Sequence, residues 1–240
     1  MHPMNPVEQY ASRVQETLRR VLDSQLENIQ SAARVVSDVA RRDGIVYTFG
    51  SGHSQLVAIE FCQRAGGLVC FDLINDRTFG KAERLEGYAR ALLDNYPIST
   101  NDALIVISNS GCNPLPVEMV GIAKERGVTT IAITSLGHSH SVASRHSSGK
   151  KVFELADIVI DNCGVPGDGV VMLPGIPDRA VGPTSTLAGV FIANCVTVMA
   201  VAYCLAAGFT PGVLMSANLA NGDATNRVLM EFIRARTKGW

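Results

Sequence analysis

Apolar side chains in the first 41 residues recur every three or four positions, with charged side chains between them. This spacing predicts an amphipathic helical arm over residues 7–41. Its apolar positions are Val7, Tyr10, Val14, Leu18, Val21, Leu22, Leu26, Ile29, Ala33 and Val36. From Ile45 onward the pattern changes to short aliphatic runs separated by helical stretches, which indicates a different architecture for the rest of the chain.

The short aliphatic runs have the length and composition of strands that are buried on both faces. They lie at 45–49, 68–71, 103–107, 130–134 and 158–160, and helices are expected at 55–65, 115–126 and 185–207. Strands that alternate with helices form parallel β-α-β units, so the sequence predicts an α/β protein, a three-layer α/β/α sandwich. We interpret the chain as one domain, with a helical arm (1–43), an α/β core (44–210) and a C-terminal tail and helix (211–240).

Composition and net charge indicate which classes of binding partner to expect. Of the 240 residues, 47% are hydrophobic and 18% are charged, which is ordinary for a globular domain and excludes a coiled coil or a disordered chain. The net charge is -1, so the protein has no overall basic field to attract nucleic acid or an anionic membrane. We therefore expect neither as a partner, and any anionic ligand has to be bound by a local site.

The cysteines, the N-terminal residues and the long apolar run indicate where in the cell the protein is expected. The six cysteines show no C-x-x-C spacing and are interpreted as reduced, structural thiols. Residues 1–20 contain no signal-peptide core, so we expect a cytoplasmic protein. The run 187–207 is long enough to cross a bilayer, but Asn194 and Thr197 interrupt it and no Lys or Arg lies close to its ends. A helix buried in a soluble core is the favoured interpretation.

The loop after the first predicted strand carries the first candidate chemistry. It reads Gly50-Ser51-Gly52-His53-Ser54. Glycines allow a sharp turn and a close approach to a ligand, and the hydroxyls and a helix amino-terminus donate hydrogen bonds to an anion such as phosphate. Gln55 stands where a dinucleotide fingerprint needs a third glycine. The alternative is that small residues occupy this turn for steric reasons alone.

A second polar loop follows the strand at 103–107. It contains Ser108, Asn109, Ser110, Gly111, Cys112 and Asn113, which are more donors than one helix cap requires. Because ligands of open parallel sheets bind beyond the carboxyl ends of the strands, the two loops are expected to share one crevice. Redundant capping is the alternative. Further hydroxyl groups follow at Thr134 with Ser135, and at Thr184 with Ser185.

Three histidines, His138, His140 and His146, lie in the polar segment 137–151. No pair of them has a spacing on a predicted helix or strand that would fix a metal geometry. The sequence therefore predicts no metal and no cofactor, and solvated loop positions are the favoured interpretation for His138 and His140.

The loops taken together resemble the SIS (sugar isomerase) domain, and the whole chain is similar to single-domain bacterial SIS proteins described as phosphosugar isomerases or phosphosugar-binding proteins. The matching blocks are 49–54, 64–67, 84–87, 144–150, 161–168 and 216–219. The resemblance implies a five-stranded parallel, flavodoxin-like sheet and a homodimer or homotetramer with sites near subunit contacts. It assigns phosphate binding to Ser54, Ser108, Ser110 and Asn113. Two residues depart from the family pattern, since Asn113 replaces a hydroxyl residue and Cys112 a polar one.

An aldose-ketose isomerase needs a base near the sugar carbonyl and a donor that polarises the carbonyl. Glu60 is the first candidate, because a carboxylate among apolar side chains of a helix is desolvated; the alternative is a surface glutamate beside Arg64. His146, in a basic serine-rich block, is the second, with an exposed loop histidine as its alternative. His53, in the first loop, is a further candidate donor.

The predicted function is phosphosugar binding with isomerisation through an enediol. One alternative is a non-catalytic phosphosugar sensor; the amphipathic arm is not notably basic and no helix-turn-helix pattern precedes residue 45, which favours an enzyme. Another is an etherase or deaminase that acts on amino-sugar phosphates. The sequence does not separate these reactions.

Overall fold

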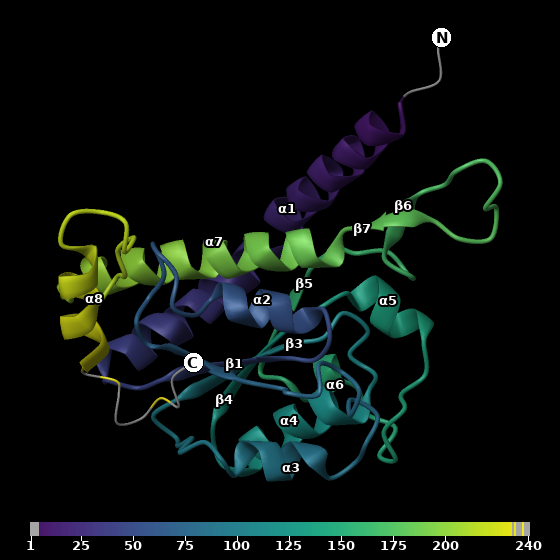
Figure 1. Ribbon diagram of the computed structural model, residues 1–240. Coiled ribbons are helices and arrows are strands. Elements are labelled where there is room, and N and C mark those ends of the chain that lie inside the picture. The colour runs from purple at the N-terminus through teal and green to yellow at the C-terminus, as the bar shows by residue number, and fades with distance from the viewer. Residues whose placement is uncertain (1–4, 232, 234–236, 238–240) are drawn as a thin grey trace.

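One parallel sheet of five strands forms the centre of the computed structural model, which describes residues 5–231, 233 and 237 (Figure 1). The strand order is β2-β1-β3-β4-β5. The strands are β1 (Val46–Gly50), β2 (Phe71–Ile74), β3 (Ala103–Ile107), β4 (Thr129–Thr134) and β5 (Ile158–Asp161). Their side chains alternate between the two faces, so that Ile105 and Ile107 belong to one apolar cluster while Leu104 and Val106 belong to the other.

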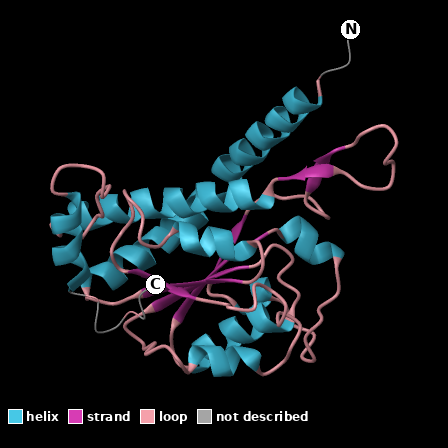
Figure 2. Cartoon of the chain, in the orientation of Figure 1, coloured by secondary structure: helices cyan, strands magenta, loops and turns pink. Residues whose placement is uncertain are grey.

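Helices cover both faces of the sheet and give the predicted three layers (Figures 1 and 2). One face carries α1 (Pro6–Arg41), α2 (Ser54–Glu60) and α7 (Ser185–Ala206). The other carries α3 (Tyr88–Leu93), α4 (Pro114–Glu125) and α6 (Val152–Leu155). Because both faces are buried, the strands read as nearly continuous aliphatic runs. The predicted fold class, with its five parallel strands, is confirmed.

The arm is one helix of 36 residues that starts with a capping box formed by Asn5 and Glu8. Its C-terminal half packs along α7, burying Ile29 and Val36, while its N-terminal half extends beyond the sandwich beside a small hairpin (Figure 1). This hairpin consists of β6 (Gly169–Val171) and β7 (Val181–Pro183). The hydroxyl of Tyr10 donates to the carbonyl oxygen of Pro183 at 2.7 Å, which joins the arm to the hairpin.

Several elements differ from the sequence prediction. α2 ends at Glu60 because the chain turns at Gln63, whose φ is 47°, and β2 begins at residue 71. Leu68, predicted to start a strand of the sheet, instead forms an isolated antiparallel bridge with Val213. The hairpin and α3, α5 (Leu136–Ser141) and α6 were not predicted, whereas the expected C-terminal helix is α8 (Gly222–Glu231).

α7 is the one helix in the described part of the chain that is long and apolar enough to cross a membrane by length and composition. It packs against α1 and α2, as expected of a core helix, but its burial is incomplete because Val198 is 70% exposed and Leu205 55%. Burial raises the pKa of Cys62 and Cys70 to about 12, as expected for structural thiols.

Candidate active site

A cleft opens at the carboxyl ends of β1 and β3. The strand order reverses at this point, because β2 lies on one side of β1 and β3 on the other, and such switch points are where open α/β sheets bind ligands. The cleft has a volume of about 600 Å³ and continues into a smaller space of about 230 Å³, which we call the inner pocket. Both spaces are lined by Ser51, Ser54, Glu83, Ile107 and Asn109.

The inner pocket gathers most of the predicted phosphate-binding residues. The first loop contributes Ser51 and Ser54, and the second contributes Ser108, Asn109, Ser110 and Asn113. His138 also lines the inner pocket, from α5 (Leu136–Ser141), so the interpretation of this histidine as a solvated loop position is corrected. No described residue accepts a hydrogen bond from the backbone N–H of Asn109 or Ser110. Four hydroxyls, two amides and free backbone donors around one small space are suited to an oxyanion.

The first loop is held by the buried carboxylate of Asp76. This carboxylate accepts hydrogen bonds from the Ser51 hydroxyl at 2.9 Å, the Gly80 backbone at 3.0 Å and the Thr78 backbone at 3.0 Å. Gly80 has a φ of 87°, and a Cβ there would lie 3.0 Å from the Cα of Gly52. The segment after β2 is therefore packed directly against the first loop and forms a wall of the cleft.

The second loop presents its amides in fixed orientations. Asn109 accepts a hydrogen bond from Asn162 at 3.0 Å, and the Oδ1 of Asn113 accepts one from Arg145 at 3.1 Å. Asn113 precedes α4, yet its side chain does not cap that helix. With Oδ1 occupied by Arg145, the Nδ2 donor of Asn113 is left for a ligand.

Glu83 is a site residue that the sequence reasoning missed. It lines both the cleft and the inner pocket and is half-buried, and no hydrogen bond or ion pair joins its carboxylate to another described residue. Its backbone carbonyl accepts a hydrogen bond from Leu115 at 3.0 Å, which fixes it near the start of α4. The polar sequence Asn75-Asp76-Arg77-Thr78 after β2 was the available signal, but the strand was predicted three residues too early for its loop to be considered.

Comparison with known proteins identifies the family of the chain. A family model described as "SIS domain" matches residues 9–135, more than half of the chain. The chain belongs to the SIS domain family. UPF0309 proteins are its curated relatives: one from Shouchella clausii is 37% identical over 238 residues, covering 95% of this chain and 96% of the relative. Another, from Listeria monocytogenes, is 38% identical over 217 residues, covering 90% and 92%.

Solved SIS structures share the fold at low identity. A phosphoheptose isomerase from Francisella tularensis has a TM-score of 0.57 at 16% identity and covers 83% of this chain and 98% of its own. The Vibrio vulnificus NanR protein, solved in complex with ManNAc-6P, has a TM-score of 0.53 at 11% identity, with coverage of 98% and 71%. These identities establish a common SIS fold and no more.

Glu60 lies outside the cleft lining of this SIS domain. Six residues of helix turn it about 120° away from Ser54, toward α7 rather than the ligand. There its carboxylate forms an ion pair with Arg64 and accepts a hydrogen bond from Asn194 at 3.0 Å. The expectation of a desolvated base is thus corrected, because the carboxylate is satisfied by partners between two helices.

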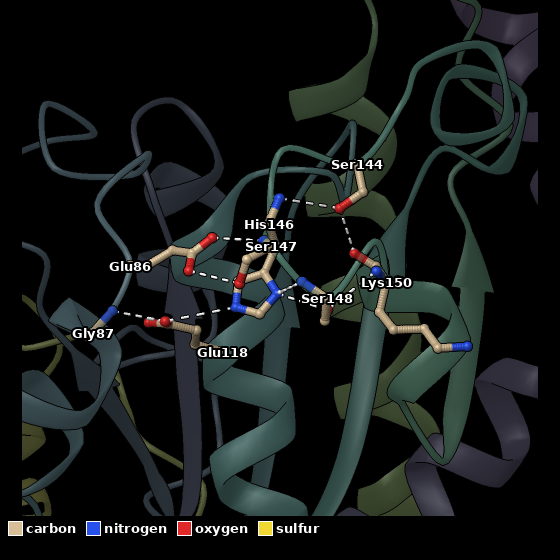
Figure 3. A network of polar contacts seen from close by, with 8 residues as sticks. All are labelled: Glu86, Gly87, Glu118, Ser144, His146, Ser147, Ser148 and Lys150. Atoms are coloured by element: carbon tan, nitrogen blue, oxygen red, sulfur yellow. Dashed lines mark hydrogen bonds and ion pairs between the residues drawn. The ribbon is translucent and has the colours of Figure 1, made fainter.

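His146 also lies outside the cleft lining and belongs to a network with Glu86 and Glu118 (Figure 3). Potential ligand atoms of these three residues lie within 4.8 Å of one another. However, His146 Nδ1 accepts a hydrogen bond from the backbone N–H of Ser148 at 3.1 Å. A neutral imidazole then carries its proton on Nε2, which points to Glu118 at 3.7 Å, and this leaves no lone pair there for a metal.

The remaining predicted residues divide between the cleft and the protein interior. His53 and Gly52 line the cleft, with the His53 ring exposed beside Phe79. Ser185 also lines it, and its hydroxyl donates to Asp168 at 2.6 Å.

Two predicted ligands are corrected by their burial. Ser135 is fully buried and caps α5, with its hydroxyl donating to the Gly164 carbonyl oxygen at 2.8 Å. Thr184 is 1% exposed and does not belong to the lining of the cleft or the inner pocket. Neither hydroxyl faces a ligand, because both are enclosed where a loop turns into a helix.

Proposed function

We propose that this SIS protein binds the phosphate group of a sugar phosphate in the inner pocket and holds the sugar in the cleft. The observation that carries the proposal is the convergence of Ser54, Ser108, Ser110 and Asn113 on one space at the switch point of the sheet. The cleft volume of about 600 Å³ lies in the range of small-molecule sites. The complex of the NanR protein with ManNAc-6P supports sugar phosphates as the ligand class.

The reaction we propose is aldose-ketose isomerisation with Glu83 as the base. The Glu83 carboxylate lines the cleft as well as the inner pocket, so it borders the space that we propose for the sugar. It takes the proton from the hydroxyl-bearing carbon next to the carbonyl while a donor protonates the carbonyl oxygen, which gives an enediol. The protonated carboxyl then returns the proton to the former carbonyl carbon, and the other enediol hydroxyl gives up its proton and becomes the new carbonyl. His53 and Lys81, which also line the cleft, are the candidate donors to the carbonyl oxygen.

A thermal-shift screen tests the ligand class. The wild-type protein is heated with a panel of pentose, hexose and heptose phosphates and with the matching unphosphorylated sugars. Because a ligand that binds only the native state raises the melting temperature, at least one phosphate is expected to stabilise the protein while its parent sugar does not. Equal effects of sugars and sugar phosphates, or no effect of any, would reject the proposal. Turnover of the stabilising compound then separates an enzyme from a sensor.

We also propose that a second copy of the chain covers the outer faces of α1 and α7. Leu22, Leu26, Leu187, Val198 and Leu205 on these helices are between 45% and 70% exposed, and α1 and α7 pack side by side, which makes their outer faces a candidate subunit interface.

The Val198→Glu variant is expected to reduce the molar mass in solution to that of one chain, measured by light scattering after gel filtration. The wild-type protein is expected at two or four copies. Val228→Glu, at a 57% exposed position on α8, is the matched control and should leave the mass unchanged. A wild-type monomer, or equal masses for wild type and Val198→Glu, would contradict the assignment.

A further inference from the structure

A short segment between α5 and α6, residues 144–150, is folded tightly on itself and is here called the strap. The Ser144 hydroxyl donates to the Lys150 carbonyl oxygen at 2.7 Å and accepts from the His146 backbone at 3.1 Å. The Ser148 hydroxyl accepts from the Lys150 backbone at 3.2 Å. These contacts, drawn in Figure 3, give the strap a defined shape although most of its residues are exposed.

Two carboxylates dock the strap onto the rest of the protein (Figure 3). Glu86 accepts hydrogen bonds from the backbone and the hydroxyl of Ser147, at 2.6 and 2.8 Å. These bonds favour the ionised form and lower the pKa of Glu86. Glu118 accepts from the Gly87 backbone at 2.7 Å and faces His146, so it ties the same region to α4. The strap is therefore held at His146 and Ser147, the two residues that directly follow Arg145.

Arg145 is the strap residue that reaches the second loop. Its backbone N–H donates to the Cys112 carbonyl oxygen at 2.8 Å, and its Nη1 donates to Asn113 Oδ1 at 3.1 Å. Within the described residues no carboxylate lies within 4.0 Å of its guanidinium. Arg145 is exposed to solvent on the strap, and its charged guanidinium is hydrogen-bonded to an amide that lines the inner pocket.

We propose that Arg145 is a positioning residue for the inner pocket, holding Asn113 with its Nδ2 toward the bound phosphate and supplying the positive charge that the pocket needs for a dianion. This inference rests on the proposed phosphosugar function. The hydroxyls and amides that line the inner pocket are neutral, Glu83 is negative, and His138 is the one lining side chain that can take up a positive charge. The guanidinium behind Asn113 adds a permanent positive charge, which favours a doubly charged ligand. Specificity for phosphorylated over neutral sugars then depends on a residue outside the pocket lining.

Isothermal titration calorimetry tests the role of Arg145. Wild type, Arg145→Ala, Arg145→Lys and Lys150→Ala are titrated with the most stabilising sugar phosphate of the panel, with inorganic phosphate as competitor, at two salt concentrations. Lys150→Ala is the matched control, because it removes one positive charge from the same strap, and the Lys150 side chain points away from the network (Figure 3). Melting temperatures without ligand show that each variant is folded.

We expect Arg145→Ala to weaken binding roughly 10- to 100-fold, the usual range for a charge-assisted contact. Arg145→Lys should recover part of this loss, Lys150→Ala should stay within about twofold of wild type, and the salt dependence of binding should flatten only in Arg145→Ala. Equal effects of Arg145→Ala and Lys150→Ala, or no effect of either, would overturn the inference and leave the proposed function standing. If the wild type binds no sugar phosphate, the proposed function fails and this inference fails with it.

Discussion

The Glu83→Gln variant is expected to lose turnover by roughly 100- to 10,000-fold, the contribution typical of a positioned general base. Glutamine has the shape of glutamate but cannot accept the proton, so the sugar phosphate should still bind. Because no hydrogen bond or ion pair joins the Glu83 carboxylate to another described residue, and the backbone contacts of Glu83 are kept in the variant, the replacement removes no structural contact on which the cleft depends. The measurement is the rate of aldose-ketose interconversion, with affinity determined separately by calorimetry.

Glu60→Gln is the control that separates the two carboxylates. Glu60 is paired with Arg64 outside the cleft lining, so this variant should keep turnover and lose a little stability at most. If Glu60→Gln lost turnover while Glu83→Gln kept it, the base would be Glu60 after all. Full activity in both variants would remove the isomerase mechanism from consideration.

Replacing both Ser54 and Ser110 by alanine should weaken sugar phosphate binding by at least about 100-fold, because two hydroxyl contacts to a charged group are lost together. The Ser54 hydroxyl forms no hydrogen bond with the described residues, and the Ser110 hydroxyl accepts only from the Cys112 thiol at 3.2 Å. The melting temperature of the ligand-free variant should therefore stay close to that of wild type.

The matched control for this double variant is Ser12→Ala with Ser31→Ala, an exposed and a half-buried position on α1 that lie outside the cleft lining. Calorimetry with the same sugar phosphate should find wild-type affinity for that pair. Unchanged affinity of the Ser54 and Ser110 double variant would show that the phosphate is bound elsewhere.

How well the bounds of a strand could be predicted depended on whether all of its residues are apolar. β3 was predicted with its observed bounds because a strand buried on both faces reads as one aliphatic run, Ala-Leu-Ile-Val-Ile. β2 was placed three residues early because it contains Asp72, a buried polar residue that the hydropathy pattern assigns to a loop. The hydropathy pattern of the sequence therefore locates a strand accurately when all of its buried side chains are apolar.

Some parts of the candidate site could be predicted from the sequence and others could not. Both polar loops were found from the sequence because glycine and serine after a strand are a local signal. Glu83 and Arg145 were not, because their places depend on the packing of segments that are more than 20 residues away from the loops in the sequence: Glu83 lines the inner pocket, and Arg145 contacts Asn113 of its lining. Glu60 was favoured for its apolar neighbours, although the helical repeat turns it away from Ser54.

The carboxylate of Asp76 has a consequence for how a ligand enters. By binding Ser51, Thr78 and Gly80 together, it couples the first loop and the segment after β2 into a single rigid wall. Another part of the lining comes from Pro183 at the end of β7 and from Ser185 and Thr186 at the start of α7, and there the Asp168 carboxylate accepts hydrogen bonds from the backbone N–H groups of Thr184 and Ser185. A buried or half-buried carboxylate therefore braces each of these two segments, and we expect the cleft to have its shape before a ligand enters.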